Sequence, residues 1–169
     1  MRRIIIMLLI TVLCLVLPGT VFHYFSWAGI KPDLPMLWVV YLALHHRTLE
    51  GIGYGFFVGL IFDIYIGRYI GLYAIVLAIV ALLVSVLQKG WYKENVLLTM
   101  GLVFGLTALG QILLLLMAST AGLNWLSLSV FKGILGIAFY NCLLVPITYP
   151  LIHRSFTDGY LAPKLKYDR

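Results

Sequence analysis

The chain alternates long apolar runs with short polar interruptions, a pattern typical of helices that cross a membrane. A helix needs about 20 apolar residues to span roughly 30 Å of hydrocarbon, with about 17 as the usual lower limit. Four runs meet this requirement: Ile4–Phe22, Tyr69–Leu87, Val96–Ala118 and Val130–Ile152. We expect each of these runs to form one membrane-spanning helix.

The region between the first and second of these runs is less regular. An apolar stretch over Leu34–Ile66 is interrupted by the polar residues 45–47 and by Glu50. It divides into two segments, roughly 34–46 and 51–66, each below the usual spanning length. Two alternatives remain open here: two short crossings, or a re-entrant pair that enters and leaves on one side.

The composition indicates that lipid is part of the solvent. Of the 169 residues, 63% are hydrophobic and 11% are charged, whereas globular domains average about 45–50% apolar and about 25% charged residues. A soluble fold of this length has too little interior to hide so much apolar surface. The sequence therefore predicts an all-α, polytopic membrane protein, with six transmembrane helices in one compact bundle over residues 1–152.

The positive charges orient this bundle. The formal net charge is +6, but the basic residues are scattered between apolar runs, which argues against nucleic-acid binding. Cytoplasmic loops of membrane proteins carry an excess of Lys and Arg. Six crossings with an inside N-terminus place nine basic residues inside and three outside, which sum to the 12 in the chain. We expect both termini in the cytoplasm, with residues 153–169 as a short tail; a re-entrant pair preserves this parity.

Asp63 is the only acidic residue well inside an apolar run. A carboxylate at a helix centre is unfavourable by roughly 2.5–3.5 kcal/mol on insertion scales, so it is usually paired or faces water. One interpretation is a proton or ion site. The other is a structural carboxylate near the outer boundary, bonded to Arg68 or to backbone amides at the next helix start. We favour the second, because Asp63 lies four residues before a Gly67-Arg68 turn.

Three stripes of small residues are each spaced for one helix face. Their members are Gly51, Gly55 and Gly59 in the first stripe, Gly101, Gly105 and Ala108 in the second, and Gly133 and Gly136 in the third. Residues four apart drift by only about 40° around a helix, so each stripe stays on one side. Small residues let transmembrane helices approach closely. We expect packing within the chain for most of them, with a partner's helix as the alternative for one stripe.

The remaining polar residues do not form a recognisable catalytic set. Gln111 and Asn141 are expected to bond across helices, each worth typically about 0.6 kcal/mol and up to about 2. His45 and His46 are adjacent, so on a helix they point about 100° apart and are poorly placed to chelate one metal ion. We therefore expect no catalysis, no cofactor and no metal site.

The stretch around Asp63 resembles a known family. Lys31-Pro32-Asp33-Leu34 opens a short span, and the next elements along the chain are Gly51, Gly55, Gly59-Leu60, Asp63, Gly67 and Gly71-Leu72. In this order and spacing they resemble the rod shape-determining protein MreD family. The resemblance extends to the length, the six-span layout, the initial basic residues and the short polar C-terminal tail.

The resemblance implies a non-enzymatic scaffold of the bacterial cell-elongation machinery in the cytoplasmic membrane. Members of the family are associated with MreC, whose single transmembrane helix leads to an extracytoplasmic domain. Through MreC they are linked to the cytoplasmic MreB filament, to the glycan polymerase RodA and to its class B penicillin-binding transpeptidase. Such a subunit regulates peptidoglycan synthesis and cell shape by binding partner helices within the lipid bilayer.

Residues with a possible structural or partner-binding role follow from the family motif and from the small-residue stripes. The candidates for helix packing or partner binding are Pro32, Asp33, Gly51, Gly55, Gly59, Asp63, Gly67, Arg68, Gly71, Gly101 and Gly105. The first two are expected to shape the outer entry to the second span.

Transport is the alternative function. The resembling family is similar in fold to the substrate-binding subunits of energy-coupling-factor transporters, which are also small six-span chains. Such a subunit binds its ligand in an outward-facing pocket, for which Asp63, Arg68 and nearby tyrosines are candidates. A stripe such as Gly101 and Gly105 would then dock the coupling subunit.

Overall fold

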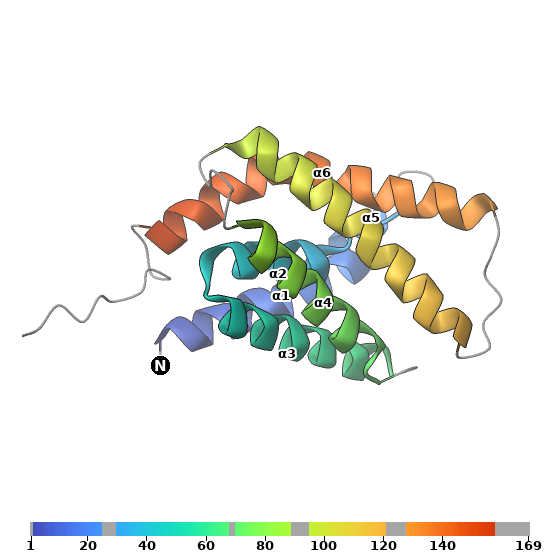
Figure 1. The fold of residues 1–169 in the computed structure, drawn as a ribbon, viewed down its shortest axis with the longest axis horizontal. Helices are drawn as coiled ribbons and strands as arrows, with labels where there is room; N and C mark the ends of the chain where they lie inside the picture. Colours follow the sequence, from blue (N-terminus) through green and yellow to red (C-terminus); the bar gives the residue numbers. More distant parts are fainter. Residues whose placement is uncertain (1, 25–29, 68–69, 89–94, 121–127, 158–169) are drawn as a thin grey trace, which may run out of the picture.

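Six helices make up most of the described chain. The computed structural model describes residues 2–24, 30–67, 70–88, 95–120 and 128–157. Its helices are α1 (Arg2–Tyr24), α2 (Leu34–His45), α3 (Thr48–Ile66), α4 (Leu72–Leu87), α5 (Val96–Thr120) and α6 (Leu128–Thr157). The protein is thus an all-α, polytopic membrane protein whose six helices form one bundle (Figure 1).

Some helices are longer than the segments that the sequence pattern predicted. α3 begins at Thr48 and has 19 residues, so it reaches spanning length although its apolar segment looked short. α6 continues to Thr157, so the first residues of the expected tail are helical. By length and apolar composition, α3, α5 and α6 can each cross a membrane. α2 has 12 residues and is about 18 Å long, well short of a bilayer.

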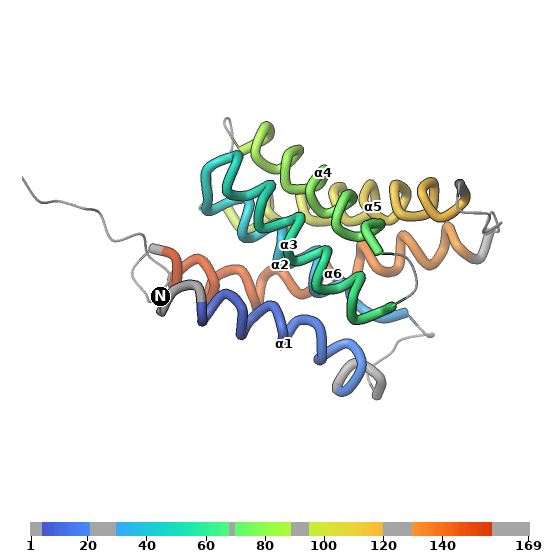
Figure 2. The backbone as a smooth tube through the Cα atoms, turned by 90° about the horizontal axis from the view of Figure 1, so that it is seen from below, coloured from blue at the N-terminus to red at the C-terminus, as the bar shows by residue number. Residues whose placement is uncertain are grey.

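α2 is the central helix of the bundle. It contacts each of the other five helices, while α3 pairs with α4 and α5 pairs with α6 (Figures 1 and 2). Every residue from Leu34 to Leu44 is buried. Because α2 is covered on all sides, it is apolar all round instead of showing one apolar stripe. The start of α1 and the end of α6 lie at the same end of the bundle in Figure 1.

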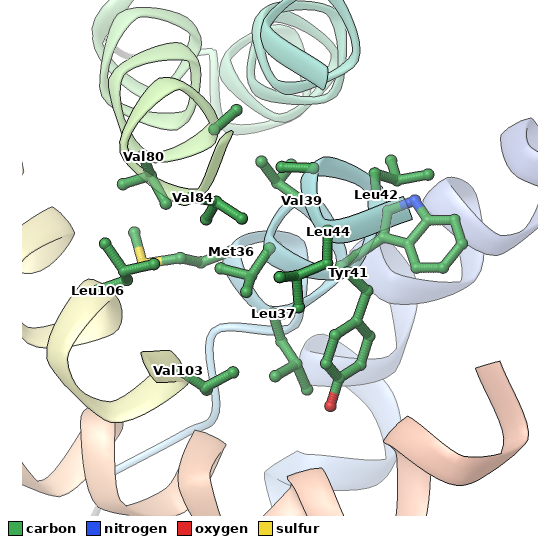
Figure 3. Close-up of a cluster of buried hydrophobic side chains, with 14 of the residues drawn as sticks. Met36, Leu37, Val39, Tyr41, Leu42, Leu44, Val80, Val84, Val103 and Leu106 are labelled. Carbon is green, nitrogen blue, oxygen red and sulfur yellow. The ribbon is translucent and has the colours of Figure 1, made fainter. Parts of the chain in front are cut away.

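The hydrophobic core forms around α2. Figure 3 shows side chains of α2 packed against α4 and α5, with labelled members Met36, Val80, Val84, Val103 and Leu106. On the outer sides of the other helices, large apolar side chains are exposed, for example Leu9 in α1 and Leu151 in α6. This arrangement is expected where lipid covers the outside of the bundle.

Candidate functional site

The carboxylate of Asp63 caps the start of α4. Its Oδ2 accepts hydrogen bonds from the backbone N–H groups of Gly71 at 2.9 Å and Ala74 at 3.0 Å, and its Oδ1 accepts one from Tyr73 N–H at 3.0 Å. The first N–H groups of a helix have no partner within that helix, and the helix dipole favours negative charge there. Asp63 therefore joins the last turn of α3 to the first turn of α4, at a position where it is 3% exposed.

Two glycines shape the connection between α3 and α4. Gly67 ends α3 with a φ of 68°, and Gly71 precedes α4 with a φ of 104°. Both values lie in the left-handed region that glycine adopts without steric strain. Arg68, the expected alternative partner of Asp63, lies outside the described residues. The bonds that the structure shows for Asp63 are to backbone amides.

The first glycine stripe lies against neighbouring helices of the same chain. A Cβ atom on Gly59 would stand 2.5 Å from the Cα of Ala74, and one on Gly55 would stand 2.7 Å from the carbonyl oxygen of Leu77. A Cβ on Gly51 would be 3.2 Å from the Cα of Ala43 in α2. The stripe thus brings the backbones of α3 and α4 into direct contact and places the Asp63 carboxylate beside the amides of α4.

Asp33 is the centre of a second polar cluster, at the start of α2. Its Oδ1 accepts a hydrogen bond from Met36 N–H at 3.1 Å, which makes Asp33 the N-cap of α2. Its Oδ2 accepts from Gln111 Nε2 at 2.7 Å and from the hydroxyl of Tyr73 at 3.4 Å. Residues of α4 and α5 therefore meet at this carboxyl group, which is 8% exposed.

Asn141 of α6 pairs with the backbone of Asp33. Asp33 N–H donates to Asn141 Oδ1 at 3.0 Å, and Asn141 Nδ2 donates to the carbonyl oxygen of Asp33 at 3.0 Å. The same Nδ2 lies 3.3 Å from Thr107 Oγ1 of α5. Asn141 is near the middle of α6, so α2 starts beside the middle of α6 and not beside its end. Non-helical backbone inside a membrane bundle is tolerated only when protein groups form hydrogen bonds with its N–H and C=O groups. Asn141 does this for the N–H and C=O of Asp33.

The segment that leads into α2 also packs tightly. Pro32 is buried next to Asp33. A Cβ on Gly136 of α6 would meet the side chain of Ile30. The candidate residues Pro32 and Asp33 are therefore both buried within the bundle.

The second glycine stripe has a different environment from the first. A Cβ on Gly101 or on Gly105 would have nothing within 4 Å, and both residues are exposed. Gly110, on the inner side of the same helix, instead lies against Met36. The outer face of α5 around Gly101 and Gly105 is therefore not covered by the described part of the chain.

A row of contacts between α2 and α6 was not foreseen from the sequence. After the pair of Asp33 and Asn141 come Tyr41 and Thr148, with hydroxyls 2.8 Å apart, and His45 and His153, with ring nitrogens 3.1 Å apart. The sequence separations are 108, 107 and 108 residues, so the two helices run parallel with a constant offset. Within the described chain, no three His, Cys, Asp or Glu residues gather as a metal site.

A comparison with models of protein families identifies the family of this chain. The family model for the rod shape-determining protein MreD matches residues 1–155, which is nearly all of the chain. The chain belongs to the MreD family. Searches among curated proteins and solved structures each found no match. Membership of the MreD family, together with the apolar helices, makes the chain a bacterial membrane protein that takes part in determining rod shape.

Proposed function

We propose that this chain is a non-enzymatic membrane subunit of the bacterial cell-elongation complex. In this role it binds the transmembrane helix of MreC and helps couple the MreB filament to peptidoglycan synthesis by RodA and a class B penicillin-binding protein. The observation that supports the proposal is the match of residues 1–155 to the MreD family. The geometry agrees with a binding role instead of a catalytic one, because the carboxyl groups of Asp33 and Asp63 already accept hydrogen bonds from groups of the same chain.

The outer face of α5 is the surface that we propose for the partner helix. Gly101 and Gly105 are open, whereas Gly55 and Gly59 already lie against α4. Close approach of a second helix at such glycines gains van der Waals contact, which is a main source of helix association in lipid. The proposal therefore assigns the first stripe to packing within the chain and the second to binding MreC.

The proposed topology has six crossings with both ends in the cytoplasm. Single cysteines at the exposed positions 31 and 132 are then labelled from outside the cell, and those at 47 and 154 only after the membrane is opened. The background for this experiment replaces Cys14 and Cys142 by serine. Outside labelling at 47 or 154 would contradict the topology.

Transport is less well supported by the geometry. For a solute-binding role, Asp63 was one of the candidate ligand-binding residues together with Arg68 and nearby tyrosines. Both oxygens of Asp63 already accept hydrogen bonds from the start of α4. Binding a solute through Asp63 would expose buried N–H groups of α4. No observation in the described residues favours this second function.

Purification of the tagged chain from its native membrane in mild detergent tests the proposed function. We expect mass spectrometry to find MreC with RodA or the penicillin-binding transpeptidase. Gly105→Leu is expected to lower the recovery of MreC at least several-fold. Gly133→Leu is the matched control, because its Cβ position on α6 is equally open. Equal recovery of MreC with both variants would reject the α5 surface, and a coupling subunit with paired ATPases would reject the function.

A further inference from the structure

Asp33 and its side-chain partners form an arrangement that is suited to holding a proton. The Oδ2 atom of Asp33 faces the amide of Gln111 and the hydroxyl of Tyr73. A hydroxyl can donate or accept, and a primary amide can turn to present either its NH₂ group or its oxygen. Both partners can therefore adapt to a protonated or an ionised carboxyl group.

The hydroxyl of Tyr73 lies farther from Asp33 than is usual for an ionised carboxylate. A hydroxyl that donates to an ionised carboxylate usually lies about 2.5–2.7 Å away, but Tyr73 is 3.4 Å from Oδ2. In this structure Gln111 Nε2 donates to Oδ2 at 2.7 Å. When Oδ2 takes up a proton, the Gln111 amide can turn so that Oε1 accepts from Oδ2–H, while Oδ1 still accepts from Met36 N–H.

The surroundings of Asp33 provide no compensating positive charge among the described residues. Its hydrogen-bond partners are all neutral groups. The basic residues whose side chains are described, Lys31, Arg47, Lys132 and Arg154, are all exposed, whereas Asp33 is buried. Withdrawal from water favours the protonated form of a carboxyl group, and we take this effect to outweigh the start of α2, whose dipole favours negative charge.

We propose that Asp33 is a proton-binding site, in which the carboxyl group holds a proton between α2, α4 and α5. Among the described residues, the other titratable group that faces it is Tyr73 from α4, whose backbone N–H is in turn bonded to Asp63. α5 contributes Gln111 and Thr107 to the cluster, and α6 contributes Asn141, none of which titrates. This proposal does not depend on which partner proteins the chain binds.

Release of the proton changes the cluster in a defined way. The O–H bond of Asp33 breaks, the proton passes to water or to a base outside the cluster, and the electron pair stays on Oδ2. The Gln111 amide then turns so that Nε2 donates to the carboxylate. The negative charge appears where α2, α4 and α5 meet, so the packing of these helices becomes sensitive to whether the proton is bound.

Infrared spectroscopy of the full chain in lipid nanodiscs tests this site. A protonated carboxyl group has a carbonyl stretch at higher frequency than the carboxylate bands, and the chain has only six Asp and Glu residues. At neutral pH we expect one protonated-carboxyl band, which disappears at alkaline pH as carboxylate absorption grows. Asp33→Asn should remove the band, and the control Glu50→Gln, at an exposed position, should leave it.

The same two variants give a second readout. Asparagine has the shape of a protonated aspartic acid, so Asp33→Asn should fold with a melting temperature close to that of the parent chain. Failure of Asp33→Asn to fold would overturn the proposal, as would absence of the band from the parent chain at neutral pH. Survival of the band in Asp33→Asn would also overturn it.

Discussion

Asp33 and Asp63 are both buried aspartates whose carboxyl groups cap the start of a helix, but they differ in the kind of donor that they contact. Asp63 accepts three backbone N–H groups from residues 8 to 11 positions later. These donors cannot turn or become acceptors, so they require a carboxylate that accepts. Asp33 has one backbone N–H and two side-chain partners, which lie 40 and 78 residues away. Backbone donors that are close in sequence and cannot turn thus hold the α3–α4 hairpin together through Asp63. Side-chain donors that are distant in sequence and can turn join α2 to α4 and α5 through Asp33.

The largest expected effect is on stability at Asp63. Asp63→Ala leaves three buried N–H groups at the start of α4 without their acceptor. An unsatisfied buried group costs about 1–3 kcal/mol, so we expect a loss of about 3–5 kcal/mol in the free energy of unfolding. Asp33→Ala removes an N-cap, for which about 0.5–2 kcal/mol is typical. Reversible unfolding in mixed micelles measures both; an equal or larger loss at Asp33 would reverse the comparison.

The next effect concerns the packing that holds Asp63 against α4. Gly59→Leu places a side chain where even a Cβ would be 2.5 Å from the backbone of Ala74. Overpacking costs typically about 1–3 kcal/mol, and backbone contact puts this variant at the upper end. Gly101→Leu, at an open position, should leave the unfolding free energy within about 0.5 kcal/mol. Similar losses for both variants would mean that the first stripe is not specially packed.

A smaller effect is expected on the Asp33 side. Asn141→Leu removes both bonds to the Asp33 backbone. Interhelical polar bonds in membranes are typically worth about 0.6 and up to about 2 kcal/mol each, so we expect a total loss of about 1–3 kcal/mol. Hydrogen exchange should increase at residues 30–36 and remain unchanged in the α3–α4 hairpin. Faster exchange spread over both regions would show that the two carboxyl groups are not separate units.

The smallest effect is expected for Thr107, which contacts Asn141 in the Asp33 cluster. Thr107→Val keeps the shape of the side chain and removes one bond of 3.3 Å to Asn141. We expect a loss of about 0.6 kcal/mol or less in the same unfolding measurement. A loss above that of Asn141→Leu would place Thr107, and not Asn141, at the centre of the cluster.

Local spacing explains what the sequence could predict. The apolar runs indicated an all-α membrane bundle, and the match to the MreD family agrees with the motif around Asp63. The interpretation of Asp63 as a carboxylate bonded to the next helix start relied on residues close to it in the sequence. The bonds to Gly71 and Ala74, 8 and 11 positions later, are of this local kind.

Long-range contacts explain what the sequence could not predict. Asp33 looked like a residue at the outer entry of a span, but it meets Gln111 and Asn141 inside the bundle. No periodicity in one sequence relates residues 78 or 108 positions apart. The pairing of His45 with His153 had one weak signal, since both lie at the cytoplasmic ends of their expected spans.

The constant offset between α2 and α6 has a consequence for biosynthesis. The ribosome makes Asp33 about 108 residues before its partner Asn141. At roughly 5–20 residues per second, this interval is on the order of ten seconds. During that time the backbone at the start of α2 lacks the amide that later satisfies it, although α3 and α4 can already pair. α6, which leaves the ribosome after the other helices, therefore completes the environment of α2. Chains that stop before α6 should be substrates for membrane quality control.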